Sequence, residues 1–434
     1  MTKSILRYLF IFSLVFQSNI ADTKESVLMV TSETELQTAI NQAKPGDEII
    51  IANGLYADWD ITIPCIGTEK SPIIIRPQTP QGVTLTDEST FKVSGSYIII
   101  QDLRFEDCRL LDSCVLLENA LDVRVTQCVF EGAFGRAPVI GVKGQSVGCR
   151  IDHCRFIKPE ARSIQISVRG EKSPMRTRID HNLFQDVPPI PSGNGRETIQ
   201  IGQNQPTWGW FSPMAVVEYN TFLRCDGEIE IISNKSSRNI YRHNLFKDCK
   251  GELVMRGASH CTIEGNRFEN CTGGIRLSGT HHRVENNLII NSQKVGIQLR
   301  YGMNKELGGH YQAVGHCLIK NNTVINSGTV GLYVGSSKNS NAGEKGIATI
   351  APYSNQIVNN IVSNNQGDVV KIDHAPNNMI TNNWFYATDQ ASVTKIEGNT
   401  ITDPQLTKDH QPKLESPAHK AGASITDLKT GPDA

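Results

Sequence analysis

The chain has 434 residues, of which 38% are hydrophobic and 20% charged, and its formal net charge is −1. This near-neutral balance excludes a strongly basic, nucleic-acid-binding protein, and it means that any site for a polyanion must be a local one. After the first residues, no apolar run approaches the length of a membrane span, which excludes stable membrane insertion. We expect a monomer with no nucleic-acid partner.

Residues 1–21 have the order of a secretory signal peptide. Lys3 and Arg7 precede an apolar run at 8–16, and small and polar residues follow it. The run is too short to span a bilayer comfortably, which favours a removable signal over a membrane anchor. The sequence therefore predicts an exported protein, either secreted or periplasmic.

Residues 22–60 are expected to form a cap over one end of the molecule. Ser32 and Glu35 have the spacing of a capping box, which opens an amphipathic helix that continues to about Ala43. A Lys-Pro-Gly-Asp turn ends this helix, and a strand at 48–52 follows. Such a helix can cover the open end of a β-structure whose unpaired edge would otherwise favour aggregation.

A short pattern recurs along the chain: an apolar residue, two mostly polar residues, Asn or Cys, one further residue, and Phe or an aliphatic residue. The closest copies are about 21–28 residues apart, which is a solenoid period. The copies lie at 125–130 (VTQCVF), 151–156 (IDHCRF), 179–184 (IDHNLF), 217–222 (VEYNTF), 241–246 (YRHNLF), 263–268 (IEGNRF), 284–289 (VENNLI), 319–324 (IKNNTV), 357–362 (IVNNIV) and 380–385 (ITNNWF).

This repeat predicts an all-β fold, a right-handed single-stranded parallel β-helix over residues 61–403. A leucine-rich repeat would need more leucines, and a propeller would need a longer period. The recurring Asn suits a tight turn with left-handed geometry, and its amide can bond to the next coil. Residues 404–434 lose the period, and we expect them to form a closing strap.

Eleven cysteines in an exported chain would ordinarily suggest disulfides, but the number is odd. Cys225, Cys249 and Cys271 occupy one position of the repeat, where stacked thiols behave as small apolar residues. We expect mostly free, buried thiols. Cys108 and Cys114 are the pair that we would test first for a bridge.

Two glutamates stand on what is predicted to be the outward face of one strand. Glu228 and Glu230 follow Cys225 by three and five residues, and Ile229 and Ile231 are expected to alternate with them toward the core. Like charges this close repel each other unless a cation lies between them. A solvated surface pair is the alternative interpretation.

Basic side chains are expected on the same face in neighbouring coils, which stack about 4.8 Å apart. Arg276 should share the column of Glu230, and Arg256 and Arg300 should point outward from the coils on either side of it. The predicted basic strip contains Arg169, Lys235, Arg256, Arg276 and Arg300. A strip of this kind would bind an anionic polymer, with Arg169, Arg276 and Arg300 contacting the substrate.

Paired carboxylates with an amide oxygen are hard ligands that suit Ca²⁺. Glu228, Glu230 and Asn194 from the preceding coil could supply them, and bound calcium would neutralise a uronate carboxylate and acidify the C5 proton. Lys235 is the expected base, with its pKa lowered by Arg256 and by the metal, and Arg256 would stabilise or protonate the departing O4. The predicted reaction is β-elimination in an acidic uronate polymer.

At these residues the sequence resembles polysaccharide lyase family 6, which contains alginate lyases and a dermatan-degrading chondroitinase. The segments that carry the resemblance are 228–236 (EIEIISNKS), Arg256, 194–202 (NGRETIQIG) and 44–56 (KPGDEIIIANGLY). It implies a β-helix, calcium on Asn194, Glu228 and Glu230, a Lys235 base and an Arg256 acid, with alginate as the leading substrate. Gln200 and Gly257 depart from residues common in that family, which leaves subsite preference open.

Three other functions remain open at this point. A glycoside hydrolase would need two carboxyl groups flanking the bond, for which the pairs Asp152-His153 and Asp180-His181 are candidates. A non-catalytic polysaccharide-binding protein or adhesin could use the same β-helix. A chondroitin or dermatan sulfate lyase would share the proposed chemistry and differ in substrate.

Overall fold

The structure is a computed structural model that describes residues 27–203, 210–305, 311–343, 346–388, 393–424 and 430–433. The predicted signal peptide, residues 1–21, lies outside these ranges. In the described part of the chain, no helix combines the length and the apolar character that crossing a bilayer requires.

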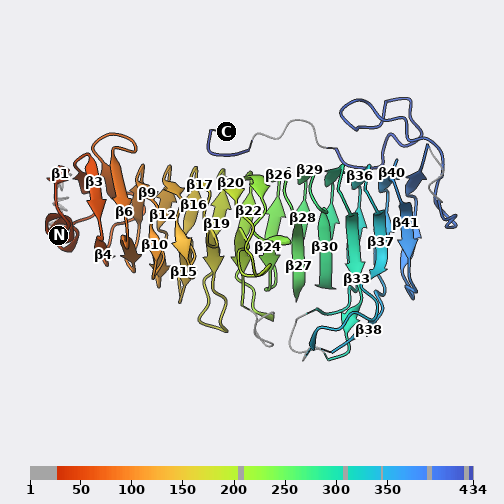
Figure 1. Cartoon of the computed structure of the whole chain (residues 1–434), viewed down its shortest axis with the longest axis horizontal. Helices are drawn as coiled ribbons and strands as arrows, with labels where there is room; N and C mark the ends of the chain where they lie inside the picture. Colours follow the sequence, from red (N-terminus) through yellow and green to blue (C-terminus); the bar gives the residue numbers. More distant parts are fainter. Residues whose placement is uncertain are drawn as a thin grey trace, which may run out of the picture.

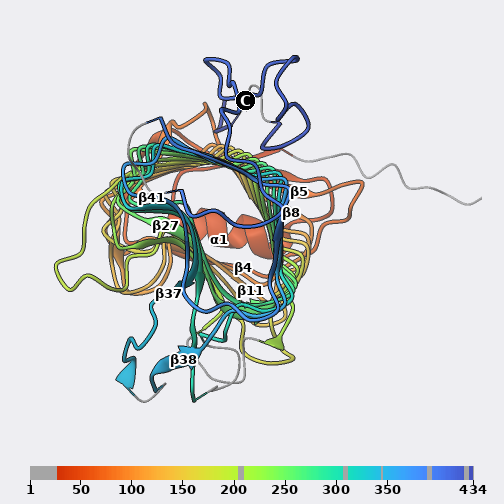
Figure 2. The ribbon, with the colours of Figure 1, turned by 90° about the vertical axis from the view of Figure 1, so that its right-hand side faces the viewer.

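The described strands form a right-handed parallel β-helix, as the repeat predicts (Figures 1 and 2). It has three long parallel sheets. The 14-stranded sheet runs from β1 (Val27–Val30) to β42 (Met379–Thr381), and the 13-stranded sheet runs from β3 (Gly54–Ala57) to β43 (Trp384–Tyr386). The third sheet has 12 strands. The strands of the 12-stranded sheet are β4 (Asp60–Ile63), β7 (Thr90–Val93), β11 (Val115–Glu118), β15 (Ile140–Lys143), β18 (Ile164–Ile166), β21 (Ile199–Ile201), β24 (Glu230–Asn234), β27 (Glu252–Ser259), β30 (Ile275–Thr280), β33 (Val295–Arg300), β37 (Val330–Ser336) and β41 (Asp368–Ile372).

The recurring motif builds two interior ladders. Its asparagines are buried, and the side-chain Nδ2 of each donates to Oδ1 of the Asn in the next coil at 2.8–3.0 Å, beginning at Asn182 and ending at Asn399. Its phenylalanines stack from Phe105 to Phe268 with ring centroids 4.5 to 5.2 Å apart. The two ladders overlap between Asn182 and Phe268, and one of them continues on each side, so the sequence period sets the coil along the solenoid.

The expectation that the recurring Asn itself takes the left-handed turn is wrong. The residue before it does so: His181, Tyr219 and His243 have φ of 55°, 54° and 54°, whereas Asn182 and its equivalents are not among the left-handed residues. The physical reason is that the recurring Asn points inward to bond along the ladder. The turn therefore falls to the preceding position, where the side chain faces solvent.

The eleven cysteines are free thiols in the structure, and all except the half-buried Cys65 are buried. Cys225, Cys249 and Cys271 stack as the repeat predicts, and the Cys225 N–H donates to the Cys249 sulfur at 3.4 Å. Cys108 and Cys114 contact each other without a bridge. Burial raises the pKa of the Cys114 thiol well above its ordinary value.

A helix covers the N-terminal end of the solenoid, and the C-terminal segment lies along its side (Figures 1 and 2). Helix α1 (Glu33–Gln42) begins at the Ser32 cap, as predicted, and buries Leu36 and Ile40 at the N-terminal end. The C-terminal segment returns along the outside of the 13-stranded sheet. There Ala423 donates its N–H to Thr323 Oγ1 at 2.7 Å, and Gly431 donates to the Tyr219 carbonyl at 2.9 Å.

One buried histidine predicts acid sensitivity of the fold. His282 Nδ1 accepts the Cys261 N–H at 3.1 Å, and burial lowers the His282 pKa to about 4. Its ordinary value, about 6.5, applies in the unfolded chain, which therefore binds the extra proton as pH falls below 6.5. We expect this residue alone to lower the free energy of unfolding by about 3 kcal/mol between pH 6.5 and 4.

The variant His282→Asn keeps a side-chain acceptor for Cys261 and removes the titrating group. Asn355 already fills this role two coils further along, where its Oδ1 accepts the Cys317 N–H at 2.9 Å. Denaturant unfolding at a series of pH values measures the effect. We expect a smaller loss of stability on acidification in the variant. Identical pH dependence in the two proteins would contradict the assignment.

Candidate active site

Three buried carboxylates meet on the outer side of the 12-stranded sheet. Glu197 precedes β21, Glu228 precedes β24, and Glu230 begins β24. One oxygen from each lies within 4.8 Å of the other two. Their exposed fractions are only 2%, 7% and 5%, so water screens the mutual repulsion poorly. The acidic cluster, as we call these three residues, is a place where a cation would be stabilising.

The geometry around Glu230 differs from simple strand alternation. Ile229 is 37% exposed, whereas Ile231 and Ile232 are both buried, so the prediction that Ile229 points inward is wrong. The pairing of β24 with β27 is irregular between Glu230 and Ile232, which inserts one residue. Beside this irregularity, Glu228 and Glu230 lie together with Glu197.

The same irregularity changes the register of Arg276. It pairs with Val254, and through it with Ser233, and so it does not share the column of Glu230 as predicted. Its long side chain nevertheless reaches the cluster, because Nη2 donates to Glu230 Oε1 at 2.7 Å. Arg276 therefore lies beside Glu230, as expected of the strip, although the expected register is wrong, and its contact with the substrate stays a prediction.

Lys235 follows β24 directly and is 4% exposed. Its Nζ lies 3.2 Å from Glu197 Oε1, and Arg162 binds the other oxygen of Glu197 at 2.7 Å. Burial is the largest cause that lowers the Lys235 pKa, and the charge of Arg256 adds to it, while Glu197 opposes both. The expected direction of the shift is correct, but burial contributes more than the neighbouring guanidinium.

Arg256 lies on β27, the next strand of the sheet, with its Nη1 at 3.7 Å from Glu230 Oε2. The guanidinium lies over the ring of Tyr311, 5.0 Å from its centroid. Burial acts to lower the Arg256 pKa, but Glu230 and Tyr311 outweigh it. The pKa is raised, and the guanidinium keeps its charge. Its buried Nε has no hydrogen-bond partner among the described residues, which leaves a donor for a ligand.

Arg276 and Arg300, two further residues of the predicted basic strip, lie on the next strands of the same sheet. Arg276 Nε lies 3.4 Å from Glu252 Oε2, and Gln298 donates to the other oxygen of Glu252 at 3.0 Å. Arg300 ends β33, and its Nε donates to Ser337 Oγ at 2.9 Å. Burial, followed by the charge of Arg276, lowers the Arg300 pKa.

The remaining predicted residues, Asn194 and Arg169, are exposed in loops that precede β21 and follow β18. The neighbour of Asn194, Gly195, donates its N–H to Glu228 Oε2, which brings this loop to the acidic cluster. Within the described residues, the Arg169 side chain has no ion pair, and its backbone N–H donates to Ser173 at 2.8 Å. Their roles as metal ligand and substrate contact stay predictions.

The acidic cluster fits a hard divalent cation. Carboxylate oxygens are the ligands that such ions prefer, and the cluster brings three carboxylates together. Among the described residues, Glu228 forms no ion pair, so its charge is not balanced by a basic side chain. Burial, followed by repulsion from Glu197 and Glu230, raises the Glu228 pKa. A bound cation would remove this repulsion.

The carboxylates considered for hydrolysis lie elsewhere, in the 14-stranded sheet. Asp152 and Asp180 are fully buried and are each held by a guanidinium through both oxygens, Asp152 by Arg124 and Asp180 by Arg150. His153 and His181 stack 5.1 Å apart at the turn. These groups form a structural charge ladder, which argues against a catalytic pair.

Comparison with known proteins agrees with this arrangement. Residues 30–425 match the Chondroitinase B family, which is more than half of the chain. The chain belongs to the Chondroitinase B family. This family falls within polysaccharide lyase family 6, as the sequence resemblance indicates. A search of curated proteins found no match.

Solved structures of the same family superpose on the chain. The PL6 family alginate lyase AlyGC has 27% identity and a TM-score of 0.82, with 94% of this chain and 58% of that one covered. A mannuronic acid specific family 6 lyase from human gut microbiota has 25% identity and a TM-score of 0.73, covering 87% and 91%. A PL6 alginate lyase in complex with a trisaccharide has 20% identity and a TM-score of 0.77, covering 95% and 96%. The chain thus spans little more than half the length of AlyGC.

Glu197 is the site residue that the sequence analysis did not single out. It stands in the segment 194–202 that carries the resemblance, yet its role depends on contacts with Lys235 and Arg162 from two other coils. The acidic pair Glu228 and Glu230 was visible as a local repetition of charge. A third acid about thirty residues earlier offers no such local signal.

Proposed function

We propose that this protein is a polysaccharide lyase that cleaves an acidic uronate polymer, most simply alginate, by Ca²⁺-assisted β-elimination. The observation that carries the proposal is the meeting of Lys235, Arg256 and three buried carboxylates on one face of the solenoid. The names of related alginate lyases support the choice of polymer.

In the proposed reaction, Glu228, Glu230 and Asn194 would hold the cation, with Glu197 beside them. When bound, Ca²⁺ would neutralise the substrate carboxylate and make the C5 proton more acidic. Lys235 takes that proton, the C4–O4 bond breaks, and a C4–C5 double bond forms. Arg256 donates hydrogen bonds to the departing O4, and a proton from the guanidinium or from water completes the leaving hydroxyl.

A digestion of alginate, dermatan sulfate and pectate under the same conditions tests the substrate class. We expect alginate to be depolymerised fastest, with mass spectrometry identifying the oligosaccharides released. Preferential cleavage of dermatan sulfate would assign the protein to the chondroitinase activity that the family's description names. Polymer binding without cleavage of any of the three would favour a binding protein or adhesin. Export of the chain, as predicted from residues 1–21, would place it with such polymers.

Arginine variants separate binding from chemistry. Among the described residues, Arg169 in the loop after β18 and Arg300 at the end of β33 make no hydrogen bond to the acidic cluster. We expect Arg300→Ala and Arg169→Ala to raise KM by about tenfold with a smaller change in kcat, as loss of a charged hydrogen bond to the substrate would do. Steady-state kinetics measure both constants. Arg283→Ala, an exposed change on β31 (Arg283–Glu285) of the 14-stranded sheet, is the control.

If Arg300→Ala or Arg169→Ala changed kcat and left KM unchanged, the assignment of that arginine to substrate binding would be contradicted.

A further inference from the structure

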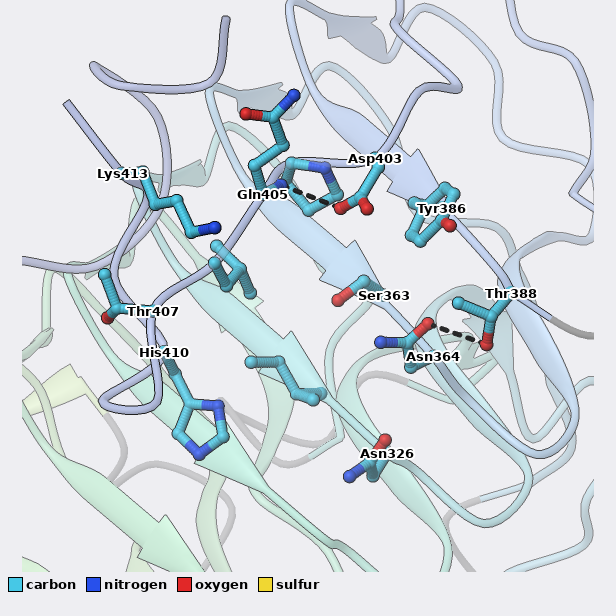
Figure 3. A pocket seen from close by; sticks show the side chains of 13 residues that line it. Asn326, Ser363, Asn364, Tyr386, Thr388, Asp403, Gln405, Thr407, His410 and Lys413 are labelled. Carbon is cyan, nitrogen blue, oxygen red and sulfur yellow. Dashed lines mark hydrogen bonds between the residues drawn. The ribbon is translucent and has the colours of Figure 1, made fainter. Parts of the chain in front are cut away.

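A polar pocket lies far from the acidic cluster, between the C-terminal strap and the last strands of the 13-stranded sheet (Figure 3). Its floor comes from the ends of β36 (Thr323–Ile325), β40 (Ile361–Ser363) and β43, and its wall comes from residues 403–413. The volume is about 410 Å³, within the range of small-ligand sites. The pocket opens on a different sheet from the one that carries Lys235 and Arg256.

The pocket is the place where an exposed amide ladder stops. At the turn that leaves the 13-stranded sheet, Asn291 Nδ2 donates to Asn270 Oδ1 and Asn326 Nδ2 donates to Asn291 Oδ1, both at 3.1 Å. Asn364 occupies the next turn but does not continue the series. Its Oδ1 accepts from Thr388 Oγ1 at 3.3 Å instead. Asn326 Oδ1 and Asn364 Nδ2 therefore remain without a hydrogen-bond partner among the described residues, and both line the pocket.

A cation and hydroxyl groups complete the lining. Lys413 points its ammonium toward the pocket from the strap, and it has no ion pair in the described part of the chain (Figure 3). Tyr386 and Ser363 add hydroxyl groups. Asp403, the acidic residue of the lining, accepts the Gln405 N–H at 2.7 Å and so is engaged by its own turn. The lining therefore offers one ammonium, the His410 imidazole, one amide donor, one amide acceptor and hydroxyls, beside the single carboxylate of Asp403.

We propose that this pocket is a second, non-catalytic saccharide site that binds a uronate unit. Lys413 would pair with the carboxylate, and Asn326 and Asn364 would bond to neighbouring hydroxyls of the sugar. An amide acceptor beside an amide donor matches the two roles of a sugar hydroxyl. The choice of a uronate deepens the proposed function, because the same polymer would reach both the pocket and the acidic cluster.

Binding of a saturated trimannuronate to the full chain carrying Lys235→Ala tests this inference without turnover. We expect isothermal titration to show two sites per chain. Adding Lys413→Ala should weaken one of them by at least about tenfold, as loss of a hydrogen bond to a charged group implies. Adding Lys408→Ala, an exposed lysine of the same segment outside the pocket, should leave both sites intact. A neutral mannotriose should bind the pocket at least about tenfold more weakly, for the same reason.

The result can be separated from the proposed lyase activity. Loss of binding on Lys413→Ala supports the pocket even if the wild-type chain cleaves no polymer. Equal binding by the Lys413→Ala and Lys408→Ala chains would overturn the inference, whatever the outcome of the activity assay. Because Lys413 is exposed, its replacement should leave the fold intact, and the melting temperature checks this.

Discussion

Replacing Lys235 with Ala should lower kcat by about 10²–10⁴-fold, the range that a positioned general base supplies. The reason is positional: Lys235 is the buried amine beside the acidic cluster, and Arg256 stands on the neighbouring strand. Steady-state rates on the best polymer measure the loss. KM should change less, because the amine acts on the C5 proton and contributes little to holding the chain.

Loss of Lys235 also leaves Glu197 with one cationic partner fewer, so stability must be measured alongside activity. The double variant Lys235→Met/Glu197→Gln replaces the ion pair with two neutral side chains of similar size. It should fold and remain inactive. Lys250→Ala, at an exposed lysine in the turn before β27, is the matched control and should keep full activity. Activity within threefold of wild type in either Lys235 variant would remove Lys235 from the mechanism.

Replacing Glu228 with Gln should raise the Ca²⁺ concentration needed for half-maximal activity. Loss of a residue that only supports a metal ligand weakens metal binding by roughly 10–100-fold, and loss of a direct ligand should weaken it more. The change removes one of three clustered carboxylates while keeping the side-chain shape and an oxygen that can accept the Gly195 and Arg196 N–H groups. The measurement is activity titrated with Ca²⁺ after chelation. High calcium should restore a large part of kcat.

Glu252→Gln supplies the control for this experiment. Glu252 is a buried carboxylate on the next strand, but it lies outside the acidic cluster and contacts Arg276 and Gln298 instead. Its replacement should leave the calcium requirement where it is in the wild type, although substrate affinity can fall. An unchanged calcium requirement in Glu228→Gln would show that the cluster does not hold the metal.

The fold was predictable because its determinants repeat. Each copy of the motif places Asn or Cys at one position and Phe or an aliphatic residue at another, and the ladders that they form, such as Asn182 to Asn220 and Phe222 to Phe246, define the coil. The turn geometry was misplaced by one residue, because the motif alone does not say whether a polar residue faces the ladder or the solvent.

The site was predictable as far as charges could be assigned to one face. Arg256 and Arg276 lie beside Glu230, as expected of a strip, whereas Lys235 pairs with Glu197, which the sequence analysis did not single out. The register irregularity at Glu230 could not be foreseen, since a single inserted residue leaves no mark in an apolar run such as Ile231-Ile232. Asn194 lies in the turn before β21, as expected from the sequence, whereas Arg169 was expected on the outward face of a strand that in fact ends at Ile166.

The products formed with and without calcium test the central claim most directly. After complete reaction with the preferred polymer, the masses of the products and the ultraviolet absorbance of a conjugated double bond are measured together. Elimination predicts an unsaturated end on each new fragment, product masses that contain no added water, and loss of both signals on chelation. Saturated fragments that have each gained one water would contradict the account, because they would require a hydrolase in place of the Lys235 and Arg256 chemistry.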